Sequence, residues 1–322
     1  MTHALRGTVL VTGGAGFIGS HLCDALLSAG HGVMAVDDLS TGRLENLAHA
    51  QSHPRFAFEE LDVRDAEALA ALARDRQAVA MFHLAANSDI RAGNAAPRRD
   101  LDQTLATTLA ALEACVAAGV PDFLFASSSA IYGELPQGVA VAEDHGPLAP
   151  ISFYGAAKLA AEGFISAYAH QHGLRSWVAR FPNVVGDRST HGVLFDFAAK
   201  LQANPTRLEV LGDGSQCKPY LLVDDLIDAL LLAWRRLPGR HDIFHIGGGT
   251  TTTVATIAQL AVAQLAPGAA IAYTGGDRGW RGDVPRFRYD TRRLAALGWQ
   301  PSRDSDAAVA EALARMAREL QP

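Results

Sequence analysis

The sequence predicts an α/β fold, a doubly wound parallel sheet followed by a second, smaller α/β lobe. From the N-terminus, short β-branched runs alternate with alanine- and leucine-rich segments of helical period, which is the pattern of parallel strands joined by crossover helices. The strand segments are apolar throughout, as in a sheet covered on both faces. A length of 322 residues is enough for two lobes with a core each.

The first lobe is expected to span residues 1–180, and its elements follow each other in regular alternation. Strands are expected near Thr8–Thr12, Val33–Val36, Phe56–Glu60, Val79–Leu84, Phe123–Ser127 and Trp177–Phe181. Helices are expected near Ser20–Ala29, Ala66–Arg74, Leu101–Ala118 and Phe153–His172.

The second lobe is expected to span residues 181–322, because after Phe181 the regular alternation gives way to loops that contain Gly, Pro and Asn. Phe244–Ile246, within residues 242–247, is expected to return as a strand to the first sheet. Helices are expected near Leu194–Gln202, Asp224–Arg236, Val254–Leu265 and Asp306–Glu319.

Charge and cysteine content exclude several classes of partner and site. The formal net charge of −6, from 28 Lys and Arg against 34 Asp and Glu, gives no long-range attraction for nucleic acid or an anionic membrane. The three cysteines show no CxxC spacing, so neither a disulfide framework nor a zinc site is expected. No metal is expected at His241 and His245 either, because residues four apart on a strand lie ~13 Å apart.

Targeting signals are also not expected. The apolar run before the first glycines is too short for the core of a signal peptide, and nowhere do eighteen apolar residues follow each other. A cytoplasmic protein is therefore predicted.

Residues 8–20, TVLVTGGAGFIGS, combine an apolar strand, three glycines and the start of a helix. Gly13, Gly16 and Gly19 permit positive φ, close approach of a pyrophosphate and tight helix packing, while the helix N-terminus supplies N–H donors. A tight turn alone also needs glycine. Asp37, however, closes the next strand about 18 residues further on, where a carboxylate can accept both ribose hydroxyls. Together these features predict a Rossmann dinucleotide site.

The cofactor is predicted to be NAD rather than NADP, because the Asp37 carboxylate would repel a 2′-phosphate. Arg43 leaves an alternative open, since it could reach such a phosphate, although it could equally be a solvated loop residue. Two alternatives also stay open for the other strand ends: Asp62 could be an acidic residue of a turn, and residues 84–86 could serve only in core packing. The predicted cofactor residues from the turn and the following strand ends are Gly13, Gly16, Phe17, Ile18, Gly19, Asp37, Asp38, Leu39, Ser40, Gly42, Asp62, Val63, Leu84, Ala85 and Ala86.

Tyr154 and Lys158 form a candidate acid/base pair, because residues four apart share one face of a helix. A phenol titrates near ~10, and a neighbouring ammonium is expected to lower the pKa of Tyr154 by stabilising its phenolate. Such spacing is common by chance, but this helix follows a strand that ends in Ser127–Ser129, at the carboxyl edge where doubly wound sheets bind ligands. A serine hydroxyl there can hydrogen-bond the oxygen that the tyrosine deprotonates.

Nearly the whole chain resembles the extended short-chain dehydrogenase/reductase family, and within it the nucleotide-sugar epimerases and dehydratases. The matching segments are TGGAGFIGSHL, DDLSTG, HLAAN, SSSAIYGE, YGAAK, RFPNVVGDR, GDGSQCKPYLLVDDL, HIGGG and RGDVPRF, in family order. The resemblance implies that Ser128, four residues before Tyr132, is the catalytic serine and that Tyr154 is the acid/base. It further implies that Lys158 holds the nicotinamide ribose, so that Tyr154 and Lys158 also count as cofactor residues.

The resemblance also implies a nucleotide-sugar site. Lys218 stands where the family commonly has Arg in GDGxxxRDY, and Trp280 occupies the usual RxGD arginine position, so Arg278 and Arg281 become the candidate diphosphate ligands. For these two arginines a solvated loop is the alternative. For Asn87 and Ser88 the alternative is that they are ordinary polar residues at the start of a helix. The implied substrate residues are Asn87, Ser88, Ser128, Ser129, Asn183, Leu194, Phe195, Val210, Leu211, Lys218, Tyr220, Arg278, Arg281 and Asp283.

The function implied is NAD-dependent epimerisation of a nucleotide-diphosphate sugar, a UDP-sugar by preference, at carbon 4 through a transient 4-keto intermediate. A homodimer through the two helices Leu101–Ala118 and Phe153–His172 is expected from the same resemblance. A dehydratase, decarboxylase or keto-sugar reductase is the alternative, although dehydratases carry Asp–Glu where this chain has Ser129 and Ala130. A non-enzymatic NAD-binding regulator would tend to lose the tyrosine and lysine that are retained here.

Overall fold

The computed structural model describes residues 7–135, 140–276, 279, 284 and 287–319. The chain divides into two compact units, of which unit 1 comprises residues 1–131, 150–180 and 230–244 and unit 2 comprises residues 132–149, 181–229 and 245–322. The sequence places residues 132–149 in the first lobe. In the structure they belong to unit 2, where strand β6 (Ala140–Val141) pairs with β15 (Arg288–Tyr289).

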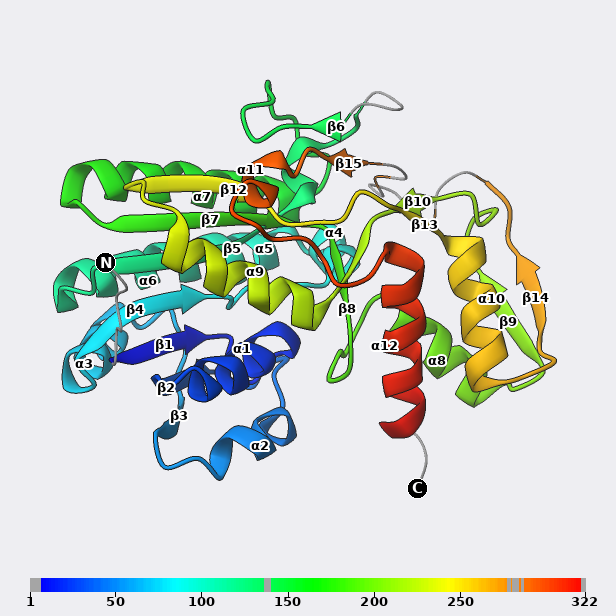
Figure 1. The fold of residues 1–322 in the computed structure, drawn as a ribbon, viewed down its shortest axis with the longest axis horizontal. Helices are drawn as coiled ribbons and strands as arrows, with labels where there is room; N and C mark the ends of the chain where they lie inside the picture. The colour runs from blue at the N-terminus through cyan, green and yellow to red at the C-terminus, as the bar shows by residue number, and fades with distance from the viewer. Residues whose placement is uncertain (1–6, 136–139, 277–278, 280–283, 285–286, 320–322) are drawn as a thin grey trace. The chain divides into compact units, whose positions relative to one another are not determined.

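Unit 1 contains a seven-stranded sheet of order β12-β7-β5-β4-β1-β2-β3 (Figure 1). Strands β1 to β5 pair in parallel, and Thr12 at the end of β1 lies opposite Val36 on one side and His83 on the other. The strands β2 and β3 follow on one side of β1, whereas β4 and β5 follow on its other side. The strand order therefore reverses between β1 and β4, and the loops after these two strands lie at the switch point where such sheets bind ligands. The strands are β1 Thr8–Thr12, β2 Gly32–Asp37, β3 Phe56–Glu60, β4 Ala78–His83, β5 Asp122–Ser128, β7 Arg175–Phe181 and β12 His241–His245.

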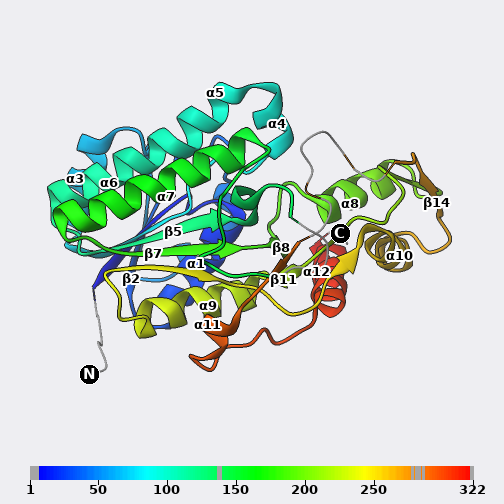
Figure 2. The ribbon, with the colours of Figure 1, turned by 90° about the horizontal axis from the view of Figure 1, so that it is seen from above.

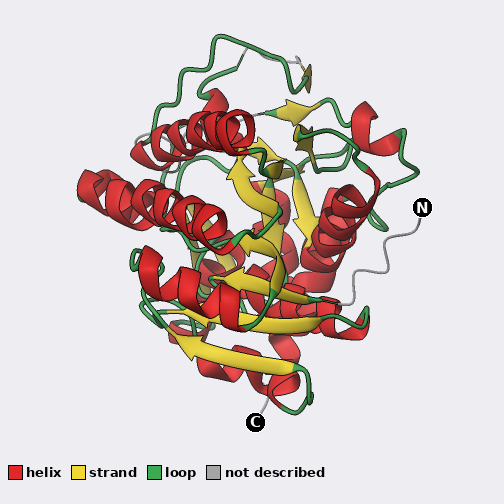
Figure 3. Ribbon diagram, turned by 90° about the vertical axis from the view of Figure 1, so that its left-hand side faces the viewer, coloured by secondary structure: helices red, strands yellow, loops and turns green. Residues whose placement is uncertain are grey.

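Helices cover both faces of this sheet. Helices α3 (Ala66–Asp75), α6 (Thr107–Ala118) and α7 (Phe153–His172) lie on one face, and α1 (Phe17–Ser28) and the later part of α9 (Val223–Arg236) lie on the other (Figure 2). Figure 3 shows the strands between these two helical layers. The core between sheet and helices includes Leu10, Met34, Leu69, Leu112, Phe123 and Ile165. The predicted doubly wound fold class is confirmed.

Two helices of unit 1 differ from the sequence expectation. Helix α1 begins at Phe17 rather than near Ser20, because Gly19 fits inside its first turn. The helix expected over residues 101–118 begins as a π-helical turn, η2 (Leu101–Ala106). There the hydroxyl of Thr108 donates to the carbonyl of Thr104 at 2.7 Å, and such back-bonding bends helices. The remaining short elements are η1 Leu44–Leu47, α2 Ala48–Gln51, α4 Ile90–Ala95, α5 Pro97–Asp100 and η3 Ser129–Tyr132.

Unit 2 is built from two-stranded pairs and helices. The pairs β8–β11, β9–β14 and β6–β15 are parallel, and β10–β13 is antiparallel. Helices α8, α10 and α12 share one apolar core with residues of β8, β9 and β11. The bounds are β8 Asn183–Val185, α8 Val193–Ala203, β9 Arg207–Val210, β10 Cys217–Lys218, β11 Tyr220–Leu222, β13 Thr252–Thr253, α10 Val254–Leu265, β14 Ala270–Tyr273, α11 Arg292–Ala295 and α12 Ser305–Glu319.

The return strand to the first sheet, expected at Phe244–Ile246, is β12 and starts three residues earlier, at His241. Among the residues that the structure describes, no helix is long and apolar enough to cross a membrane.

Candidate active site

The glycine turn after β1 forms a close-fitting cradle. Gly13 has φ +69°, and a side chain there would come within 2.7 Å of the backbone nitrogen of Ala85, which follows β4. A side chain at Gly19 would overlap the carbonyl oxygen of Gly13. Gly16, the N-cap residue of helix α1, provides no side-chain cap, so N–H groups of the first turn are left for a ligand. The turn therefore fits a dinucleotide pyrophosphate, and the structure brings Gly13 and Ala85, two of the predicted cofactor residues, close together.

Asp37 at the end of β2 closes the other side of this turn. Its carboxylate accepts hydrogen bonds from the backbone N–H groups of Ala15 (3.0 Å) and Leu39 (2.9 Å), and the residue is 6% exposed. Burial raises the pKa of Asp37, and the two backbone bonds act against this rise. Each oxygen can still accept one further hydrogen bond, as a ribose hydroxyl would require.

The other predicted cofactor residues lie at the ends of their strands. Asp38 holds Ser40 through the serine backbone N–H (3.0 Å) and hydroxyl (2.6 Å). Gly42 lies over Asp37, since a Cβ at residue 42 would be 2.6 Å from its Oδ1. Asp62 binds the Arg64 guanidinium, which lowers the pKa of Asp62. Val63 is buried.

Ser128, Tyr154 and Lys158 meet at the carboxyl end of β5. The Ser152 hydroxyl caps helix α7 by accepting from the Gly155 N–H at 3.1 Å, which places Tyr154 in the first turn. A side chain at Gly155 would overlap the carbonyl of Ala130, so the glycine lets the helix approach the strand end. The Ser128 hydroxyl donates to the phenol oxygen of Tyr154.

The Lys158 side chain is 2% exposed and points back toward β5. Its Nζ donates to the carbonyl of Ala126 at 2.6 Å and lies 4.5 Å from the centre of the Phe125 ring. Burial lowers the pKa of Lys158 to about 7, against the influence of Glu162 and Asp100. Lys158 is therefore poised between its charged and neutral forms near neutral pH.

The pKa of Tyr154 moves in the direction opposite to the sequence expectation. Burial raises it to about 12, Asp100 adds to the rise, and the Ser128 hydrogen bond opposes it. Desolvation disfavours the phenolate more than its surroundings favour it. In this arrangement Tyr154 carries its proton at neutral pH.

Asn87 is placed inside the fold rather than open to a sugar. It is 4% exposed, and its Nδ2 donates to Oδ1 of Asp100 (2.8 Å) and to the carbonyl of Asp89 (3.1 Å). Its backbone N–H donates to the hydroxyl of Thr104 at 3.2 Å. Ser88, the next residue, is exposed and Ser129 is partly exposed, so both can meet a ligand.

Unit 2 holds the other predicted substrate residues. Asn183 of β8 and Tyr220 of β11 are register partners, so the structure brings these two together. Leu194 and Val210 are buried in the apolar core of unit 2 and Phe195 packs against that core, whereas Leu211 is 39% exposed. Lys218 lies on β10. Arg278, Arg281 and Asp283 lie outside the described residues.

The matching family model is that of the NAD dependent epimerase/dehydratase family, over residues 9–247. The chain belongs to this family. It is 36% identical to a UDP-glucose 4-epimerase of Mycolicibacterium smegmatis over 95% of this chain and 96% of that protein. A crystal structure of a UDP-galactose 4-epimerase shares 34% identity at a TM-score of 0.86, with 98% and 100% of the two chains covered.

The dTDP-glucose 4,6-dehydratase DesIV from Streptomyces venezuelae, solved with NAD and TYD bound, is 28% identical at a TM-score of 0.88, with 97% of each chain covered. Membership of the epimerase/dehydratase family together with these relatives confirms the predicted family, the NAD cofactor and the reaction class of NAD-dependent nucleotide-sugar epimerisation. Because a dehydratase is among the similar structures, dehydration stays the alternative reaction.

A buried ion pair that the sequence motifs did not indicate lies next to Ser128 and Lys158. Glu162 accepts the hydroxyl of Ser127 at 2.5 Å and binds Arg180 of β7 through Nε (3.0 Å) and Nη2 (2.6 Å). The pair ties α7 to β5 and β7, directly beside Ser128 and Lys158. One signal pointed to it, since Glu162 is four residues after Lys158 and shares its helix face.

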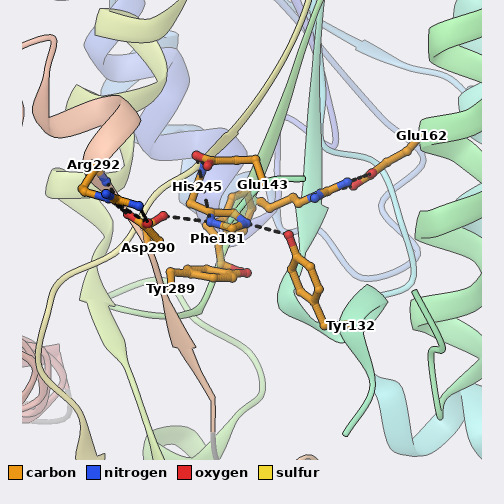
Figure 4. A network of polar contacts seen from close by, with 9 residues as sticks. Tyr132, Glu143, Glu162, Phe181, His245, Tyr289, Asp290 and Arg292 are labelled. Atoms are coloured by element: carbon orange, nitrogen blue, oxygen red, sulfur yellow. Dashed lines mark hydrogen bonds and ion pairs between the residues drawn. The ribbon is translucent and has the colours of Figure 1, made fainter. Parts of the chain in front are cut away.

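Motif spacing also gave no sign of a network in unit 2 around His245 (Figure 4). The ring is fully buried, lies 4.2 Å from the parallel ring of Tyr289, and bonds through Nδ1 to the carbonyl of Asp290 at 3.0 Å. Because a carbonyl only accepts, Nδ1 carries the proton and Nε2 accepts from the Tyr132 hydroxyl at 2.6 Å. Glu143 accepts the backbone N–H of His245 at 2.9 Å.

Proposed function

We propose that this protein interconverts the carbon-4 epimers of a nucleotide-diphosphate hexose, with a UDP-sugar favoured. The observation that carries the proposal is the meeting of Ser128, Tyr154 and Lys158 at the end of β5, in the same unit as the glycine turn. NAD, when bound, supplies the chemistry of accepting a hydride from carbon 4 and returning it.

Tyr154 is the proton carrier in this proposal. As the phenolate, which the Ser128 hydrogen bond favours, it takes the proton of the 4-hydroxyl while that carbon is oxidised. As the phenol it gives the proton back to the 4-keto oxygen while the carbon is reduced, so protons balance over the cycle. Ser128 donates to the same oxygen and steadies the charge that develops there. Lys158 supplies a positive charge that eases the transfer from the substrate to Tyr154.

The glycine turn, Asp37 and the strand-end residues hold the cofactor in this proposal. Gly13 and Gly19 admit the pyrophosphate, and the carboxylate of Asp37 accepts the ribose hydroxyls. In unit 1, the exposed Ser88 and the partly exposed Ser129 are proposed to contact the nucleotide sugar. In unit 2, Asn183 and Tyr220 are proposed as substrate residues.

A dehydratase is the second candidate, because such enzymes are among the relatives. Elimination of water needs an additional acid and base next to the catalytic hydroxyl. Ser129 and Ala130 occupy those positions here, and neither titrates near neutral pH. The proposal therefore favours epimerisation.

The test is incubation of the purified protein with a panel of UDP-, dTDP-, GDP- and CDP-sugars, with products identified by NMR and mass spectrometry. We expect a UDP-hexose to yield its 4-epimer at unchanged mass, without accumulation of NADH. A Tyr154→Phe variant is the matched control and should form this product at least about 10²-fold more slowly. A product lighter by one water would establish the dehydratase instead, and one lighter by carbon dioxide a decarboxylase.

A homodimer and a cytoplasmic location complete the proposal. Helix α7 and the helix formed by η2 and α6 pack together in unit 1, and they expose Leu101, Val116, Phe153 and Phe164, between 38% and 49% each. Exposed apolar side chains on adjoining helices fit a helical dimer contact. Light scattering at micromolar concentration should give twice the chain mass, and a monomer mass would contradict the dimer.

A further inference from the structure

A buried carboxylate outside the predicted site lies close to Tyr154 and Lys158. Asp100 ends helix α5 and is 1% exposed. Helix α5 and the π turn η2 both pack against α7, which carries the tyrosine and the lysine. The negative charge of Asp100 raises the pKa of Tyr154 and that of Lys158.

Asp100 does not reach the reacting groups through its oxygens. Its Oδ1 accepts the hydrogen bond from Asn87 Nδ2 at 2.8 Å. Its Oδ2 is buried and has no hydrogen-bond partner among the described residues. Gly93 closes this side, since a side chain at residue 93 would overlap Oδ2. A carboxylate enclosed in this way acts on its neighbours through its charge.

The other carboxylate near Lys158 is held in an ion pair. Glu162 is bound by Arg180, and both side chains are about 5% exposed or less. By contrast, no ion pair joins Asp100 to another described residue. A buried anion favours a positive charge on a buried ammonium next to it. Glu162 and Asp100 therefore both favour the ammonium form of Lys158, Glu162 the more strongly, and Asp100 is the one of these two that no ion pair holds among the described residues.

The histidine near Lys158 carries no charge. The Thr108 hydroxyl donates to the carbonyl of Thr104 and therefore accepts from Nε2 of His83 at 3.2 Å, which leaves Nδ1 to accept from Thr12 at 2.7 Å. Burial lowers the pKa of His83 to about 3. Burial raises the pKa of Asp100, and Asp89 adds to this rise. The hydrogen bond from Asn87 and the positive charges of Arg99 and Lys158 act against it and favour the carboxylate.

We propose that Asp100 is a positioning residue that holds the protons of the Tyr154–Lys158 pair through its buried negative charge. It keeps Lys158 in the ammonium form and keeps Tyr154 ready to return its proton to the 4-keto oxygen. The proposal rests on the proposed roles of Tyr154 and Lys158. Its test reads the charge of Lys158 directly, so it can fail or succeed independently of turnover.

The chain contains only three lysines, Lys158, Lys200 and Lys218, so the side-chain signals of ¹³C- and ¹⁵N-labelled lysine can be resolved by NMR. A Lys158→Arg variant assigns the signal of Lys158 by its loss. In Asp100→Asn we expect the Lys158 titration to move to lower pH, with the ratio of charged to neutral lysine falling on the order of tenfold at a given pH. Lys200 and Lys218 should titrate as before.

Asp102→Asn is the matched control. It removes the same charge two residues further along the chain, from an Asp102 side chain that is 43% exposed. We expect it to leave the Lys158 titration unchanged. An equal shift in both variants, or no shift in Asp100→Asn, overturns the proposal.

A second variant covers the case in which Asp100→Asn does not fold. Asn87→Ala removes the hydrogen bond that favours the Asp100 carboxylate, so this carboxyl protonates more readily and the Lys158 titration should again move to lower pH. In either variant the pH profile of kcat/KM should shift as a whole to lower pH, because both groups of the pair lose proton affinity. A lower rate with an unshifted profile would indicate a purely structural role.

Discussion

The two compact units bury their polar groups in different ways. In unit 1 the buried polar side chains gather at the ends of long parallel strands, as Ser127, Glu162 and Arg180 do around β5 and β7. In unit 2 the strands have two to four residues, apart from the shared ends of β7 and β12, and side chains tie distant segments together, as Tyr132 and His245 do across 113 positions. Regular backbone positions the site in unit 1, and individual side-chain contacts organise unit 2.

The largest effect is expected for the reaction itself, in unit 1. Tyr154→Phe should lower kcat by about 10²–10⁴-fold, because the proton carrier is lost, while NAD binding is retained. Steady-state kinetics and calorimetric titration with NAD measure the two quantities. Undiminished activity would remove Tyr154 from the proposed mechanism.

The second effect concerns the buried ion pair of unit 1. Glu162→Ala should lower the free energy of unfolding by about 3–5 kcal/mol, because it leaves the Arg180 charge buried without a partner. Glu311→Ala in unit 2 is the comparison: Glu311 is 31% exposed, and Arg315 keeps Asp187 and Asp224 as partners. That change should cost below about 1 kcal/mol. Denaturant unfolding measures both free energies. Equal losses in Glu162→Ala and Glu311→Ala would contradict the expected difference between the buried and the partly exposed ion pair.

The third effect concerns cofactor choice. Asp37→Ser should weaken NAD binding by about tenfold to a hundredfold, since hydrogen bonds to a charged group contribute about 1.5–3 kcal/mol, and it should relax the bias against NADP. Arg43→Ala is the control and should leave the preference for NAD intact. Equal affinity of the unmodified protein for NAD and NADP would refute the role of Asp37.

The smallest effect is expected in unit 2. Tyr132→Phe leaves Nε2 of a fully buried histidine without its donor, which should cost about 1–2 kcal/mol in unfolding free energy. Tyr168→Phe, a partly buried tyrosine of α7, should leave stability unchanged. No loss in Tyr132→Phe would mean that the His245 network does not stabilise unit 2.

The same contrast explains how far the sequence predicts the molecule. The glycine spacing, Asp37 and the Tyr154–Lys158 pair are predictable because each follows from local geometry at a strand end or on one helix face. Asp100 and Arg180 were not found, because their importance arises from burial and from neighbours that are distant in sequence. The rise in the pKa of Tyr154 was missed for the same reason, since desolvation depends on the whole surrounding fold.

The π turn η2 between Asp100 and helix α6 records an extra residue in what would otherwise be a continuous helix. Each residue of an α-helix turns the chain by about 100°, so the insertion sets the rotation of everything before it relative to everything after it. Deleting one residue from Leu101–Ala106 would restore regular winding while the packing of α6 stayed in place. The Asp100 carboxylate would then rotate away from α7, so the winding of this one turn also determines the electrostatics of the site.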